Sequence, residues 1–262
     1  MALIRDSDTG LVLIQADWPD CPANVHAYSS TRMGGVSLAP YGDVNGDAGL
    51  NMGEHVGDSR DAVRINRDCL LDYMPKPVTF LSQIHGNIAV DLASVVADQI
   101  IEADACFTSL PNLTCVVLTA DCLPLLLASA DGECVAAVHA GWRGLANGVI
   151  ESTLKHMRLK TRAEISAWMG PAIGPNAFEV GSEVREIFSR KSHKHALNFI
   201  PNKQAEGKFF ANIYGLASDV LKACDVQKIS GGNFCTYTDE ELFYSYRRDG
   251  VTGRMASWIW IG

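Results

Sequence analysis

The chain has 262 residues, of which 47% are apolar and 20% charged, and its formal net charge is −8. Such a composition is typical of a globular protein that buries a full hydrophobic core. The negative charge argues against a general surface for nucleic acid or for anionic membranes. An anionic small substrate would instead need a local pocket of arginine side chains. We therefore expect small-molecule partners, and neither nucleic acid nor membrane.

The sequence carries no sign of export or of membrane insertion. Its first twenty residues lack the basic segment and apolar core of a signal peptide. Asp121 interrupts the longest apolar run, which therefore stays below the roughly 18–20 residues of a membrane span. The eight cysteines contain no C-x-x-C pair, which favours reduced thiols in the cytoplasm. With no linker or repeat visible, we expect one domain, residues 1–262, acting as a monomer.

The predicted elements are mostly strands, several of them in direct succession. Runs rich in β-branched residues predict strands, and capped segments with a 3.6-residue apolar period predict helices. In chain order we predict a strand at 25–31, a helix at 57–74 with its N-cap at Asp58 or Ser59, strands at 78–86, 88–92, 103–109, 115–128 and 134–142, a helix at 144–158, a strand at 164–174, helices around 182–190 and 211–224, and a strand region at 228–237. This succession favours an α+β fold with helices outside a strand-built centre.

Three metal-binding side chains stand at the ends of predicted strands. They are His85 in "SQIHG", Cys122 in "TADCLP" and His139 in "VHAGWRG", each followed within two residues by glycine or proline. Two imidazoles and one thiolate are a normal ligand set for zinc, and three protein ligands leave a fourth position open. Their spacings of 37 and 17 positions match no short zinc pattern. The residues alone therefore equally allow a buried cysteine and two hydrogen-bonded histidines.

Several longer motifs resemble those of one family across nearly the whole chain. They are "SSTRMGGVS", "LNMGEHVGD", "SQIHG", "TADCLPLLL", "AVHAGWRGLANGVIE", "MGPAIGP" with "FEVG", and "CTYTDEELFYSYRRDGVTGRMASWIWI". Together they resemble the laccase-domain family, long filed as polyphenol oxidases and now described as purine nucleoside phosphorylases. The resemblance implies a single-domain layered sandwich with central mixed β-sheets flanked by helices, and zinc held by His85, Cys122 and His139. Asn176 and Asn212 depart from residues common in the family, Cys and Asp, which bears on substrate preference.

The resemblance also implies a reaction. Phosphate would cleave adenosine or inosine, and S-methyl-5′-thioadenosine as a further substrate, to the free base and a sugar 1-phosphate. Adenosine deamination would be a side activity, although the H-x-E and P-C-x-x-C signature of the usual zinc deaminases is absent. Cys122, His139, His85 and Asp121 form the candidate catalytic set. Asp121 is either the acid/base or a carboxylate that supports the neighbouring ligand.

Arginines are the natural candidates for binding phosphate, because a guanidinium matches the anion with two parallel hydrogen bonds. Arg32 lies in the glycine turn "TRMGG", Arg143 at the start of a predicted helix, and Arg247 in "SYRRDG". The helix start adds free N–H groups at Arg143. Asn51 and His55 in "LNMGEHVGD" are further candidates for the substrate pocket, with loop capping as their alternative role.

Two other functions use the same residues. The copper-dependent polyphenol oxidoreductase of the older family name needs roughly ten histidines and a cysteine. One chain with seven histidines cannot supply them, although copper can enter the three-ligand site. A cysteine hydrolase or amidase would use Cys122 as nucleophile, His139 as base, and His85 or Asp121 to orient the base. Metal content separates this hydrolase from a metalloenzyme.

Overall fold

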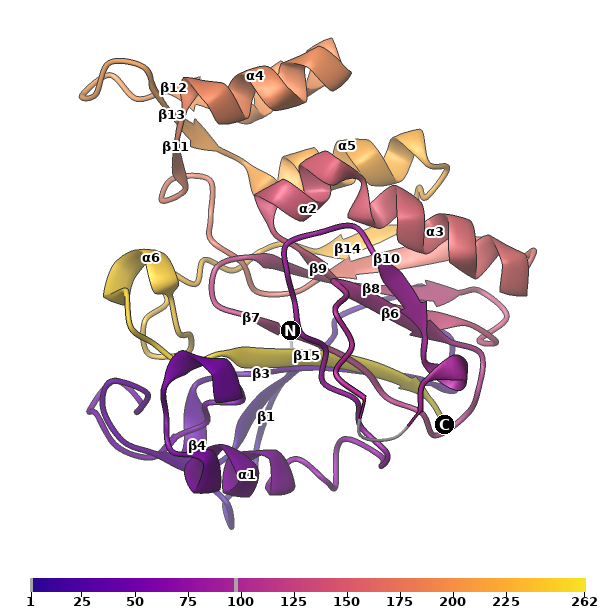
Figure 1. Cartoon of the computed structure of the whole chain (residues 1–262), viewed down its shortest axis with the longest axis vertical. Coiled ribbons are helices and arrows are strands. Elements are labelled where there is room, and N and C mark those ends of the chain that lie inside the picture. The colour runs from indigo at the N-terminus through magenta and orange to yellow at the C-terminus, as the bar shows by residue number, and fades with distance from the viewer. Residues whose placement is uncertain (1, 97–98) are drawn as a thin grey trace.

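Two β-sheets packed face to face form the centre of the molecule, and helices lie outside them (Figure 1). The computed structural model describes residues 2–96 and 99–262. The first sheet has five antiparallel strands in the order β1 (Ala2–Arg5), β2 (Val12–Gln15), β3 (Val25–Ser30), β15 (Met255–Ile261) and β7 (Cys115–Thr119). Strand β15 therefore joins strands that lie far apart in the sequence.

The second sheet has six strands and is mixed. Its order is β14 (Ile229–Gly231), β10 (Ile165–Met169), β8 (Leu123–Ser129), β9 (Val135–Ala140), β6 (Ala105–Thr108) and β5 (Ala89–Asp91). The four central strands pair antiparallel, and the outer pairs β10–β14 and β6–β5 are parallel. Every residue of β8 and β9 is buried, because this sheet is covered on both faces.

Alternating side chains place β7 between two hydrophobic clusters. Cys115 and Val117 point into the core between the two sheets, whereas Val116 and Leu118 join the cluster on the outer face of the first sheet. This follows from the two-residue period of a strand. A strand that is buried on both faces reads as a continuous apolar run, as this one does.

Helices form the outer layers. On the second sheet these are α2 (Trp142–Asn147), α3 (Val149–Lys160) and α5 (Ile213–Ala223), whose apolar residues share one cluster with β8 and β9. Helix α1 (Arg60–Asp68) lies on the side of the first sheet that faces away from the second sheet (Figure 1). None of the described helices has the length and apolarity needed to cross a bilayer.

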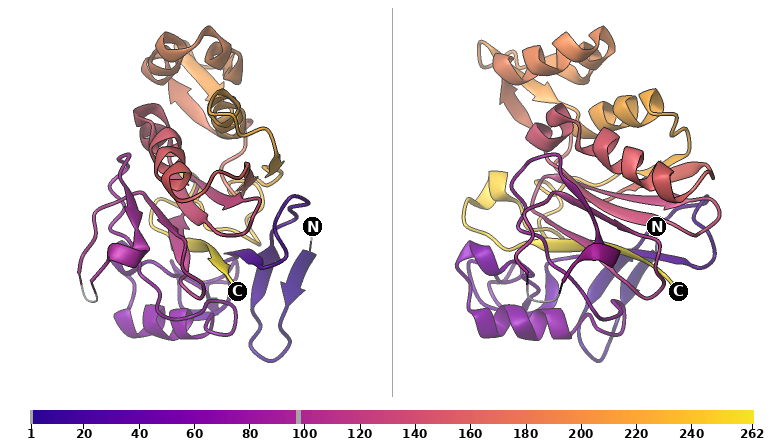
Figure 2. Two further views of the ribbon diagram at one scale, coloured as in Figure 1. Left: turned by 90° about the vertical axis from the view of Figure 1, so that its right-hand side faces the viewer. Right: turned by 45° about the vertical axis from the view of Figure 1, so that its right-hand side comes forward.

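A small third sheet lies at the end of the molecule farthest from α1 (Figures 1 and 2). It comprises β11 (Glu179–Gly181), β13 (Lys208–Ala211) and β12 (Phe199–Pro201), next to α4 (Ser182–Lys191) and the 3-10 helix η3 (His193–Asn198). The remaining elements are β4 (Met33–Ser37), the 3-10 helices η1 (Glu54–Val56) and η2 (Leu92–Ser94), and α6 (Tyr246–Asp249). The arrangement confirms the predicted α+β layered sandwich with flanking helices. Of its two central sheets, the second is mixed, as predicted, whereas the first is antiparallel.

Two predicted elements prove to be broken in the middle. The strand predicted at 115–128 forms β7 and β8, which belong to different sheets. The chain turns between them with φ of 88° at Asp121. The helix predicted at 144–158 is likewise divided into α2 and α3 by Gly148, whose φ is 89°. Apolar residues continue on both sides of each break, so periodicity alone joins the two halves.

Other predicted elements are longer than the observed ones. The first helix has Ser59 as its N-cap, as predicted, but it ends at Asp68 rather than residue 74. Segment 78–86 forms only isolated bridges, and the strand regions at 164–174 and 228–237 shrink to β10 and β14. The sequence analysis also missed β1, β2 and β15.

Candidate metal centre

The fold brings the three predicted ligands to one point. The ligand atoms of His85, Cys122 and His139 all lie within 4.8 Å of one another. Cys122 Sγ is 3.9 Å from His85 Nε2, and the two imidazole rings stand nearly perpendicular, at 79°. A tetrahedral ion with zinc-like bonds would hold such atoms about 3.3–3.6 Å apart. The three side chains therefore fit one metal ion after a small closure.

Two of the ligands stand on or beside strained backbone. His85 itself has φ of 59°, and Asp121, directly before Cys122, has φ of 88°. A left-handed conformation costs a residue other than glycine about 1–2 kcal/mol. Such strain persists only where the surroundings enforce it, and it clusters at functional sites. His139 instead comes from regular β9, opposite Pro124 of β8.

Gly141 is part of the site because it has no side chain. A Cβ atom built there would lie 2.9 Å from Cys122 Sγ, 3.2 Å from His85 Cδ2 and 3.5 Å from His139 Nε2. The ligand cluster thus packs directly on this glycine. In the sequence this glycine marks only the end of a strand, so its role in the site was missed.

Asp104 is a second residue that the sequence analysis missed. Its carboxylate is fully buried and accepts a hydrogen bond of 2.8 Å from His139 Nδ1. It also accepts the backbone N–H groups of Gly86 at 2.6 Å, His85 at 2.9 Å and Ile84 at 3.3 Å. With Nδ1 donating to Asp104, the Nε2 atom of His139 is left to bind a metal. The signal was an acid inside the apolar run "ADACF".

The ligand cluster favours a thiolate. Burial alone would raise the pKa of Cys122, but the charge of His139 and hydrogen bonds to His139 and His85 lower it to about 6. Burial alone would lower the pKa of His139, yet Cys122 and Asp104 raise it to about 9. In the metal-free protein the two side chains therefore form a thiolate–imidazolium pair at neutral pH.

Asp121 uses its carboxylate to hold the turn that carries Cys122. One oxygen accepts the Thr236 hydroxyl at 2.6 Å, and the other accepts the backbone N–H of Arg247 at 2.7 Å. The carbonyl of Asp121 accepts the N–H of Ile173 at 2.9 Å. These contacts tie the turn to α6 and to two neighbouring loops.

The three predicted arginines differ in what their guanidinium groups contact. Arg32 is buried and donates to the carbonyls of Gly42, Asp43 and Glu240. Arg143 is exposed above the Trp142 ring, and in the described part of the chain it makes no hydrogen bond or ion pair. Arg247 is exposed on α6 and donates to the Glu179 carbonyl at 2.8 Å. The donors of Arg32 are therefore largely occupied by backbone carbonyls, whereas Arg143 keeps its donors available.

Asn51 and His55 also differ. Asn51 is fully buried, donates to the Gly53 carbonyl and to Asp58, and accepts the N–H groups of Gly53 and Arg254. These contacts match loop capping, the alternative role predicted for Asn51. His55 is exposed on η1, and its pKa is lowered by partial desolvation and by the positive charges of Arg254 and Arg67.

Arg254 is a further arginine beside the site, and it was not among the candidates predicted from the sequence. One of its terminal nitrogens donates to the carbonyls of Thr252 and Gly253, each at 3.0 Å. Within residues 2–96 and 99–262, its Nε and second terminal nitrogen make no hydrogen bond. Burial lowers its pKa, and the negative charges of Cys122 and Asp121 act in the opposite direction. A half-buried positive charge therefore lies close to the ligand cluster.

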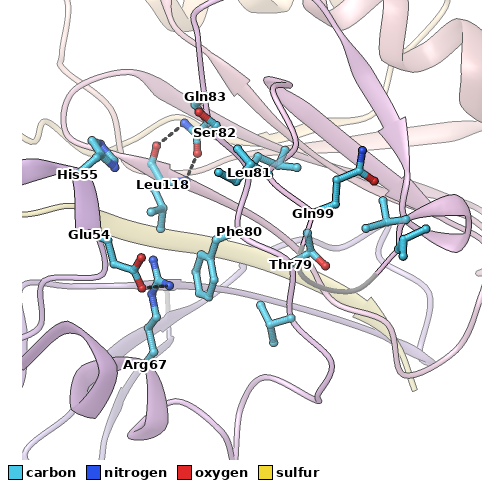
Figure 3. A pocket seen from close by; sticks show the side chains of 14 residues that line it. Glu54, His55, Arg67, Thr79, Phe80, Leu81, Ser82, Gln83, Gln99 and Leu118 are labelled. Carbon is cyan, nitrogen blue, oxygen red and sulfur yellow. Dashed lines mark hydrogen bonds and ion pairs between the residues drawn. The ribbon is translucent and has the colours of Figure 1, made fainter. Parts of the chain in front are cut away.

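A cavity of about 810 Å³ lies beside the segment that leads to His85 (Figure 3). Phe80 and Leu118 give it apolar walls, and an ion pair of 2.7 Å between Arg67 and Glu54 borders it. His55 and Gln83 also line it (Figure 3), and Gln83 is two residues before His85. None of the three ligand residues lines the cavity. It is a neighbouring space of a size that suits a small molecule.

The motifs and this geometry agree with a known family. The family model for multi-copper polyphenol oxidoreductase laccases matches residues 26–262. The chain belongs to this family. The resemblance drawn from the motifs is thereby confirmed.

Relatives within the family carry a different functional name. A purine nucleoside phosphorylase of Haemophilus influenzae is 47% identical over 249 residues, which cover 94% of this chain and 98% of the relative. The purine nucleoside phosphorylase YfiH of Escherichia coli K12 is 46% identical over 252 residues, which cover 95% and 98%.

Solved structures share the sandwich. A Neisseria meningitidis protein of family DUF152 has a TM-score of 0.86 and 41% identity, covering 95% of this chain and 98% of its own. The YfiH protein of Bacillus licheniformis has a TM-score of 0.84 and 27% identity, covering 99% of both chains.

Proposed function

We propose that the protein is a metal-dependent purine nucleoside phosphorylase. It cleaves adenosine or inosine with phosphate to the free base and ribose 1-phosphate, with S-methyl-5′-thioadenosine as a further substrate. The observation that carries the proposal is the convergence of His85, Cys122 and His139 on one point, in a chain whose relatives are named purine nucleoside phosphorylases. The enzyme acts as a single-domain monomer in the cytoplasm.

Zinc is the metal that we assign to the three ligands, because two imidazoles and a thiolate suit it and leave a fourth position open. When bound, zinc would supply a Lewis-acidic charge that polarises a substrate oxygen or activates a water. The second of these chemistries is the basis for adenosine deamination as a side activity. Copper is the alternative occupant, since it binds N and S ligands more tightly.

Arg254 and Arg143 are the arginines that we assign to phosphate, because both keep guanidinium donors available near the ligand-bearing segments. Arg32 serves instead to hold its loop, and Arg247 supports the site through its backbone N–H to Asp121. In the reaction, a phosphate oxygen forms the bond to C1′ while the N-glycosidic bond breaks toward the base. Paired guanidinium groups would hold the dianion in line for this attack.

The nucleoside would lie between the ligand cluster and the cavity of Figure 3. His55 and Gln83 line the cavity, and Gln83 is two residues before His85. The apolar walls at Phe80 and Leu118 suit a flat purine. Asp121 has two possible roles, direct acid/base or support of Cys122. Its contacts to Thr236 and to the Arg247 backbone favour the second.

The test is incubation of zinc-loaded protein with adenosine, with and without phosphate, followed by chromatography of the products. We expect adenine and ribose 1-phosphate only with phosphate, and inosine in either case. Cys122→Ala should abolish both activities together, because it removes a ligand of the common site. No turnover of adenosine, inosine or methylthioadenosine would refute the proposal.

A cysteine hydrolase or amidase is the second candidate, and the low pKa of Cys122 beside His139 favours it. Its nucleophile must be free, whereas a metal ligand is occupied. Elemental analysis of the purified protein decides between them. About one metal ion per chain supports the phosphorylase, and metal-free protein with amidase activity supports the hydrolase.

A further inference from the structure

We infer that two buried aspartates shape the metal site in two separate halves: Asp104 positions both histidines, and Asp121 positions Cys122. The inference rests on the metal site of the proposed function, but not on the reaction. Neither aspartate belongs to the ligand set His85, Cys122 and His139. Both are positioning residues that act through the ligands.

Asp104 serves two ligands with one carboxylate. Its Oδ1 atom accepts the His139 ring N–H at 2.8 Å and the His85 backbone N–H at 2.9 Å. Its Oδ2 atom accepts the N–H groups of Gly86 and Ile84. Four donors fill the acceptor capacity of a carboxylate. The first contact fixes which nitrogen of His139 faces the cluster, and the other three hold the left-handed turn at His85.

The backbone of Asp104 is fixed as well. Its N–H donates to the Ile88 carbonyl at 3.1 Å, and its carbonyl accepts the N–H of His139 at 2.7 Å. The side chain is fully buried, so water does not compete for its lone pairs. His139 is therefore held by Asp104 through both its backbone and its ring.

Asp121 performs the corresponding task for the thiolate. It precedes Cys122 directly, and its carboxylate is held by Thr236 and by the N–H of Arg247. These partners come from a loop and from α6, whereas those of Asp104 come from segment 84–86 and β9. Among the described residues the two aspartates share no hydrogen-bond partner. The two halves meet at the ligands, where Cys122 Sγ lies 3.9 Å from His85 Nε2. Loss of both aspartates should therefore weaken the site more than loss of either, with the contact between the ligands setting the departure from strict additivity.

The test compares Asp104→Asn, Asp121→Asn and the double variant by zinc affinity, measured in competition with a chromogenic chelator. Asparagine keeps the shape but turns one acceptor oxygen into a donor, which then faces N–H or O–H donors. We expect each single variant to bind zinc about 10–100-fold more weakly. The double variant should bind zinc more weakly than either single variant.

Asp131→Asn is the matched control. Asp131 also accepts three hydrogen bonds, from Ser129, Thr161 and Glu133, but it lies at the other end of the β8–β9 hairpin. Its substitution should leave zinc affinity unchanged. Unchanged affinity in Asp104→Asn, or a double variant no weaker than one single variant, would overturn the inference. Zinc affinity is measured without substrate, so a failed phosphorylase proposal leaves this result intact.

Two further measurements test the inference even if an aspartate variant does not fold. Long-range ¹H–¹⁵N spectra of the zinc-loaded wild type should show His139 with its proton on Nδ1; a proton on Nε2 would contradict the assigned role of Asp104. For the other half, Thr236→Val removes one donor to Asp121 without changing the side-chain shape. It should weaken zinc binding several-fold, and unchanged affinity would contradict the role of Asp121.

Discussion

At the scale of single residues, Gly141 is the position where the site most clearly requires a residue without a side chain. A methyl group there would lie 2.9 Å from Cys122 Sγ, inside normal contact distance. We expect Gly141→Ala to fold but to lose most of its metal, because the thiolate must move away from the imidazoles. Metal content after gel filtration measures this. Asn147→Ala, an exposed position on helix α2, which begins directly after Gly141, should keep its metal; an equal loss there would point to a general defect.

The reactivity of Cys122 should depend on metal and on pH. Its pKa of about 6 lies below the usual thiol range, so the metal-free protein carries a thiolate at pH 7. Alkylation by iodoacetamide should therefore be fast at pH 7 and should slow as the pH falls through about 6. Bound zinc should protect the thiol. Peptide mapping by mass spectrometry measures both effects, with fully buried Cys115, whose pKa is raised by burial, as the unreactive reference.

Substitution of Arg254 should lower activity, whereas substitution of Arg32 should lower stability. Arg254→Ala should weaken phosphorolysis by about 1.5–3 kcal/mol, the cost of a lost charge-assisted hydrogen bond, and should spare deamination. Arg143→Ala should act in the same direction. Arg32→Ala should mainly lower thermal stability, because its guanidinium supports three buried or half-buried carbonyls. Phosphate titrations and thermal melts separate these effects; equal loss of both activities in Arg254→Ala would move the phosphate site elsewhere.

At the scale of elements, segment 78–86 connects the cavity to the ligand His85. Ser82 is exposed and lines the cavity without contacting a ligand. Ser82→Trp should fill part of that space and raise KM for the nucleoside about tenfold or more, with zinc content unchanged. Lys203→Trp, exposed on the β12–β13 hairpin, provides the control for an added indole. An unchanged KM in Ser82→Trp would show that the nucleoside does not enter the cavity.

Strands and helices were predicted correctly where the apolar pattern ends at the same place as the element itself. The run at 134–142 predicted β9 to within two residues at each end, because strand and pattern both end near Gly141. The runs through Asp121 and Gly148 failed, since both residues adopt left-handed conformations inside patterns that continue past them. The three ligands were visible as residue types at strand ends. Asp104 and Arg254 were not, because their roles depend on contacts between distant segments.

At the scale of the whole molecule, metal binding should stabilise the sandwich. Cys122 lies in the turn between sheets, and His139 belongs to the second sheet. Zinc binds only where these segments are assembled, so at 100 times its Kd it should add about 2.7 kcal/mol. For a chain of this size that corresponds to roughly 5–10 °C in Tm. Calorimetry before and after treatment with a chelator measures the shift. His85→Ala protein should show little response to zinc.

The position of β15 also has a consequence for how the protein is made. Residues 255–261 pair with β3 on one side and with β7 on the other. During synthesis, the ribosome produces both neighbours long before the strand that belongs between them. The second sheet can assemble from β6, β8, β9 and β10 as they emerge, but the first still lacks the strand between β3 and β7. Until residues 255–261 leave the ribosome, β3 and β7 present unpaired edges, which is when the nascent chain most needs protection from aggregation.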